Sequence, residues 1–142
     1  MERPTWTTPD GRMLYKAETS RHHIFSERDW YRTPLQRKVR QMGGAVVQLA
    51  NQPHRELHAN VEHPPLVNPN LMQDIYLHSR SRGYETAYDL FYDIVEYVGW
   101  VANGSRQTQQ NVDDASRLHA NLLEQAVFIE LGRLTPYERQ AA

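Results

Sequence analysis

The sequence predicts an α+β fold in which a small strand-and-helix module precedes a bundle of three helices. Residues 45–49 form a short apolar segment with two adjacent valines, which is typical of a buried strand. After residue 67, three longer stretches repeat apolar side chains at helical spacing. Pro64 and Pro65 lie between these two parts and stop any helix that reaches them. We therefore expect a first module over residues 1–63 and a helical part over 64–142.

Composition narrows the class of protein. A chain of 142 residues is long enough for one domain with a core. There is no cysteine, which excludes disulfides and thiolate metal sites, so any metal must be held by nitrogen or oxygen ligands. No apolar run approaches the roughly 20 residues of a membrane span, and the first residues lack the apolar stretch of a signal peptide. We expect a cytoplasmic protein with no membrane partner.

Charge is distributed unevenly along the chain. Residues 1–60 carry ten Lys or Arg against six Asp or Glu, whereas residues 61–142 carry six against eleven. A basic half beside an acidic half is expected when one part of a protein faces nucleic acid and the other supports it.

The predicted elements of the first module follow from turn and cap signals. Residues 1–20 form an irregular arm with a short strand near 13–15. Thr33 and Pro34 open a helix over 35–42, which Gly43 and Gly44 end. Asn51 is expected to cap the helix that follows the buried strand.

The helical part is predicted from apolar stripes and their breakers. Asn68-Pro69 starts a helix that runs to about Arg80, a second helix covers 86–102, and a third covers 108–131. Short loops between them favour antiparallel packing. We expect the tail from Thr135 to fray.

Four of the seven histidines lie in two segments on either side of the predicted strand. His22 and His23 are adjacent, so on a strand their side chains point to opposite faces. His54 and His58 stand one turn apart on one face of a helix and can chelate together. The sequence thus offers three neutral imidazole ligands, His22, His54 and His58. It also offers a further imidazole, His23, that can take a proton from water near neutral pH.

The segment Arg21-His22-His23-Ile24, followed by an apolar strand and a helix with two histidines, resembles the HNH endonucleases and their ββα-metal finger. The resemblance covers residues 19–60. It implies that His23 is the general base, that His22, His54 and His58 hold one divalent ion (Zn, Mg, Mn or Ni), and that the activity is hydrolysis of DNA.

Partner contacts are expected around this finger. Six basic residues are candidates for contacts with DNA phosphates: Arg21, Arg28, Arg37, Lys38, Arg40 and Arg55. The simpler interpretation of Arg37, Lys38 and Arg40 is a solvated helix face. The remaining histidines, His63, His78 and His119, are expected to have structural roles.

A second hypothesis stays open. HNH enzymes place an orienting Asn near the start of the second strand, and this sequence has Gly43, Gly44 and Ala45 there. The alternative is a non-catalytic protein derived from an HNH finger. Its acidic, aromatic helices would bind a protein partner or a second copy of the chain.

Overall fold

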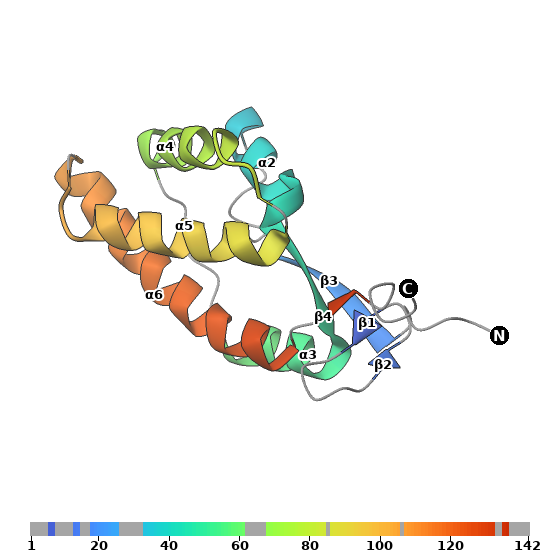
Figure 1. Ribbon diagram of the computed structural model, residues 1–142. Coiled ribbons are helices and arrows are strands. Elements are labelled where there is room, and N and C mark those ends of the chain that lie inside the picture. Colours follow the sequence, from blue (N-terminus) through green and yellow to red (C-terminus); the bar gives the residue numbers. More distant parts are fainter. Residues whose placement is uncertain are drawn as a thin grey trace.

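The computed structural model describes residues 6–7, 13–14, 18–25, 33–61, 68–84, 86–105, 107–132 and 135–136. Within these ranges the fold is α+β and mostly helical, as Figure 1 shows. The helices are α2 (Pro34–Gln41), α3 (Asn51–Asn60), α4 (Pro69–Arg80), α5 (Ala87–Ala102) and α6 (Gln109–Gly132), with a 3-10 turn, η2 (Gly43–Ala45). The strands are β1 (Trp6–Thr7), β2 (Met13–Leu14), β3 (Thr19–His23), β4 (Val46–Ala50) and β5 (Thr135–Pro136).

Strands β3 and β4 form an antiparallel pair that leads directly into a helix. His22 lies opposite Val47, and Ser20 lies opposite Leu49. Residues opposite each other in such a pair share a face, so His22 occupies a position on the same face as two buried apolar side chains. Helix α3 begins at the residue after β4 and packs against both strands. Two paired strands and a helix therefore pack together, with His22 on the first strand and with α2 and η2 between the two strands along the chain.

Helix α2 connects the two strands and begins as the sequence predicts. The Thr33 hydroxyl accepts a hydrogen bond from the Gln36 amide (3.1 Å), and the Gln36 side chain accepts one from the Thr33 amide (3.0 Å). Pro34 stands in the first turn, where its missing N–H is no loss. The turn η2 then returns the chain to β4. Its Gly44 lies so close to Leu90 of α5 that a Cβ would come within 2.0 Å of a Leu90 methyl carbon.

Helices α4 and α6 pack against α5, the most apolar of the three long helices. Helix α5 contacts α4, α6 and η2, and buries Leu90, Phe91, Ile94 and Val98 at 1% exposure or less. Helix α6 also packs against α3, so its length links the helical part to the strand pair (Figure 1). The predicted boundary between modules falls in residues 62–67, which lie outside the described ranges, and the division stays a prediction. Among the described helices, none combines the length and the apolar character that crossing a membrane requires.

Two expectations are corrected. Asn51 is not the cap of α3: it is the first helical residue, and its side-chain oxygen accepts a hydrogen bond from the Ser20 hydroxyl at 2.5 Å. Because the strand runs into the helix without a loop, the capping position falls on Ala50. The tail was expected to fray from Thr135, yet Thr135 and Pro136 pair with β1, and residues 137–142 lie outside the described ranges.

Candidate metal centre

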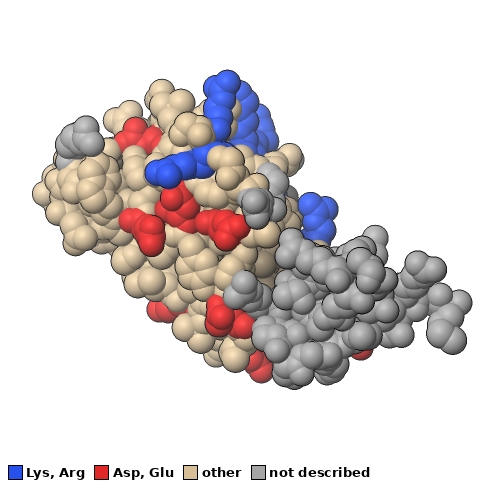
Figure 2. Space-filling model, viewed as in Figure 1, with Lys and Arg blue, Asp and Glu red and all other residues tan. Residues whose placement is uncertain are grey.

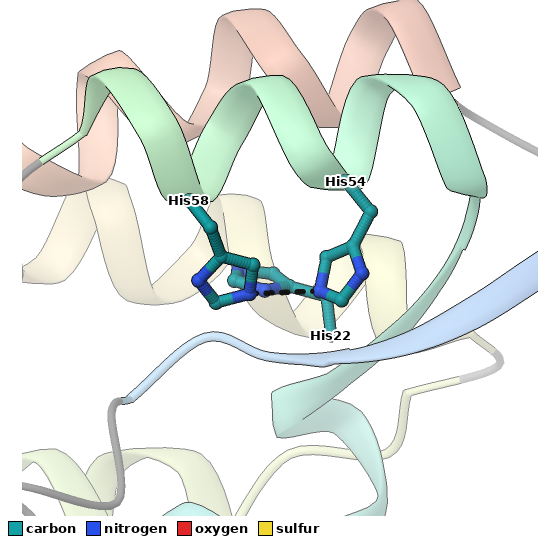
Figure 3. Close-up of side chains that lie close together, drawn as sticks. All are labelled: His22, His54 and His58. Atoms are coloured by element: carbon teal, nitrogen blue, oxygen red, sulfur yellow. Dashed lines mark hydrogen bonds between the residues drawn. The ribbon is translucent and has the colours of Figure 1, made fainter.

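Three imidazole rings from β3 and α3 converge on one volume (Figure 3). His22, His54 and His58 each offer one ring nitrogen, and the three nitrogens lie within 4.8 Å of one another. The ring centroid of His22 is 5.4 Å from that of His54 and 5.6 Å from that of His58. This group can hold a metal ion.

The helix supplies two of the rings because four residues separate them. His54 and His58 point from α3 toward β3 (Figure 3), with their Nε2 atoms 2.9 Å apart. In a tetrahedral zinc site, ligand nitrogens about 2.0–2.1 Å from the ion are roughly 3.3 Å apart. The 2.9 Å between His54 and His58 is below that value and the 4.8 Å limit for the three nitrogens is above it, so the rings must rotate for all three nitrogens to reach one ion.

The strand supplies the third ring from a buried position. His22 is 1% exposed, whereas His54 is partly buried and His58 is exposed. His22 Nε2 lies 2.8 Å from the side-chain oxygen of Gln125 on α6. His22 Nδ1 is buried and has no hydrogen-bond partner among the described residues. Burying a polar atom without a partner costs free energy, and a metal ion bound to Nδ1 would remove that cost.

Burial and repulsion between the rings favour the neutral forms of His22 and His54. Burial lowers the pKa of His22 from 6.5 to about 4, against the opposing effect of the Gln125 hydrogen bond, and repulsion from His54, His58 and His23 lowers it further. Burial, followed by repulsion from His58, also lowers the pKa of His54. A metal ligand must be an unprotonated imidazole, so both shifts favour binding at neutral pH.

His23 is placed apart from the three converging rings. It is the last residue of β3, opposite Val46, and strand alternation turns it to the other face from His22. Its side chain is partly buried. Arg21 shares this second face and is exposed.

The predicted phosphate-binding residues are spread over more than one element. Arg37 and Lys38 are exposed on α2, and the Lys38 ammonium lies 5.9 Å from the centre of the Tyr76 ring. Arg40 donates from Nε to the backbone oxygen of Phe25 at 3.1 Å, which gives it a structural contact. In Figure 2 many of the visible Lys and Arg side chains gather toward α2, and most of the visible Asp and Glu side chains lie toward α5 and α6.

The remaining predicted positions are one arginine of α3, two residues outside the described ranges and two histidines of the helical part. Arg55 on α3 is exposed and donates to Gln52 at 3.0 Å. Arg28 and His63 lie outside the described residues. His78 is held by Asp93 at 2.6 Å and stacks on Tyr97, while His119 packs beside Gly99, so both have the structural contacts that the sequence predicts.

Sequence reasoning missed the contribution of α6 to this site. Gln125 and Asn121 are buried polar residues on the inward face that otherwise carries Leu118, Leu122 and Ile129. A signal was available, because an amide that falls at helical spacing within an apolar stripe needs a buried hydrogen-bond partner. Nothing in the sequence indicates that the partner is His22.

Comparisons with protein families, with curated proteins and with solved structures find no match for this chain.

Proposed function

We propose that this chain is a metal-dependent endonuclease of the HNH type that hydrolyses phosphodiester bonds in DNA. The observation that carries the proposal is the convergence of His22, His54 and His58 on one volume. The packing of β3, β4 and α3 supports it, since a ββα-metal finger also has two strands and a helix with its histidines on the first strand and the helix; here α2 and η2 are inserted between the strands.

The donor set favours a borderline metal ion. Among the described residues the group has three imidazoles and no carboxylate, a set that suits Zn²⁺ or Ni²⁺ better than Mg²⁺, which prefers oxygen ligands. Three protein ligands also leave a coordination position open, as in catalytic rather than structural zinc sites. When bound, the ion supplies positive charge that stabilises the charge developing on the phosphate and the leaving oxygen.

His23 has the role of general base in this proposal. It follows the metal ligand His22 directly along the strand and is not one of the converging rings. As a base it takes a proton from the attacking water. Arg21 lies on the same face and offers a cation for the phosphate.

The test is plasmid nicking by full-length protein with Zn²⁺, Ni²⁺, Mn²⁺ or Mg²⁺. We expect cleavage with at least one ion and a loss of about 100-fold or more in His23→Ala, the scale of general-base catalysis. His119→Ala, which removes a histidine of α6, is the control and should cleave like the wild type. Absence of cleavage with every ion, or equal cleavage by His23→Ala, contradicts the enzyme proposal.

Two observations favour a second function, a non-catalytic interaction protein that retains the finger. The backbone at Gly44 packs against Leu90 and leaves no space there for the orienting amide of HNH enzymes. On α6, Leu123, Val127 and Leu131 are 47–64% exposed at four-residue spacing, an apolar stripe suited to a protein partner or a second copy. Such a protein would bind metal and gain stability from it, yet leave the plasmid intact.

A further inference from the structure

A side chain from the far end of the chain contacts the histidine group. Gln125 on α6 and His22 on β3 are 103 residues apart in the sequence and are 2% and 1% exposed. The side-chain oxygen of Gln125 lies 2.8 Å from Nε2 of His22. A buried hydrogen bond of this length fixes both groups relative to each other.

The orientation of the Gln125 amide follows from its other contacts. Its nitrogen lies 3.2 Å from the backbone oxygen of Ile24 and 2.7 Å from the side-chain oxygen of Asn121. A backbone carbonyl oxygen only accepts hydrogen bonds, so a flipped amide would set oxygen against oxygen. The amide nitrogen therefore faces Ile24, and the amide oxygen faces His22.

The amide in turn determines which nitrogen of His22 carries the hydrogen. An amide oxygen cannot donate, so the hydrogen in the contact belongs to His22 Nε2. A neutral imidazole has a single N–H, which leaves Nδ1 with a lone pair. Nδ1 is the buried atom that lacks a hydrogen-bond partner among the described residues.

We propose that Gln125 is a positioning residue of the metal centre, which holds His22 in the Nε2–H tautomer so that Nδ1 is its ligand atom. The inference rests on the metal site of the proposed function. Metal-binding histidines commonly donate their second N–H to an oxygen acceptor, which orients the ring and raises its basicity. Here the acceptor comes from α6, so the centre is completed by a helix outside the finger.

The first measurement is Zn²⁺ affinity of the full-length chain, by competition with a chromophoric chelator. Gln125→Met keeps the approximate size of the side chain but removes the acceptor. We expect it to bind Zn²⁺ about 10–100-fold more weakly than the wild type. The matched control is Asn111→Ala, which removes another buried amide of α6 that bonds Gln107 and not a histidine. Its affinity should equal that of the wild type.

The second measurement needs no variant: ¹⁵N NMR of the histidine rings in the wild type. We expect the metal-free protein to carry the His22 hydrogen on Nε2, and Zn²⁺ to shift the Nδ1 resonance while Nε2 keeps its hydrogen. Any one of three results overturns this inference and leaves the proposed function standing. They are a hydrogen on Nδ1, zinc bound to Nε2, and unchanged Zn²⁺ affinity in a folded Gln125→Met. Failure of the wild type to bind any of the four ions instead removes the proposed function, and this inference with it.

Discussion

At the scale of single residues, the site depends on which nitrogen atoms are available rather than on the number of histidines. His22 is kept neutral by burial, and His54 and His58 are held one helical turn apart on α3. The three rings differ in exposure, so they differ in what their removal would do. Loss of buried His22 would leave a cavity and an unsatisfied Gln125, whereas loss of exposed His58 removes a ligand atom and little packing.

His58→Ala therefore separates metal binding from folding. Loss of an outer-sphere partner typically weakens metal binding by about 10–100-fold. We expect a larger fall in Zn²⁺ affinity here, because a ligand itself is lost. The free energy of unfolding of the metal-free protein should change by no more than about 0.5 kcal/mol. Chelator competition and urea unfolding measure the two quantities.

Asn60→Ala, an exposed substitution on the same helix, is the control for His58→Ala and should leave both quantities unchanged. Equal zinc affinity in His58→Ala and Asn60→Ala would remove His58 from the ligand set.

At the scale of elements, the sequence predicts those features that depend only on the spacing of residues within one strand or helix. Strand alternation separates His22 from His23, and helical spacing brings His54 and His58 together. The cap at Asn51 was predicted wrongly, because the rule assumes a loop before the helix and β4 leads into α3 without one. The contact between Gln125 and His22 was not predictable, since it depends on how α6 packs against α3.

The close contact between η2 and α5 gives a prediction at this scale. In Gly44→Ala the new Cβ would lie 2.0 Å and 2.7 Å from two carbons of Leu90, so η2 or α5 must shift. Overpacking of this kind typically costs about 1–3 kcal/mol of the free energy of unfolding, which urea denaturation measures.

Gly83→Ala is the control for this overpacking, because a Cβ at Gly83 meets no atom within 4 Å. Similar stability of the two variants would mean that η2 and α5 are not packed as described.

At the scale of the whole molecule, the histidine group joins the strand pair, α3 and α6 into one unit. The protonation of His22 is therefore tied to folding. Above pH 6.5 the ring is neutral in the folded and unfolded chain, so pH has no effect through this group. Between pH 6.5 and about 4 the unfolded chain binds a proton that the folded chain does not, which favours unfolding.

The pH dependence of the metal-free protein tests this coupling. From the His22 pKa of about 4, we expect His22 to lower the free energy of unfolding by about 3 kcal/mol as the pH falls from 6.5 to 4. The lowered pKa of His54 acts in the same direction. Urea denaturation across this range, in the presence of a chelator, measures the loss.

His22→Gln provides the reference for that loss, because the amide can still donate to Gln125 but does not titrate in this range. The wild type should lose more stability than His22→Gln as the pH falls. Parallel curves would show that the fold does not hold His22 in its neutral form.

The central claim is that His22, His54 and His58 form one binding site for a single metal ion. Isothermal titration of metal-free, untagged protein with Zn²⁺ tests it most directly, with the His54→Ala, His58→Ala double variant alongside. We expect one ion per chain for the wild type and loss of that binding in the double variant. A wild type that binds no Zn²⁺, or a double variant that binds it equally well, would contradict the account.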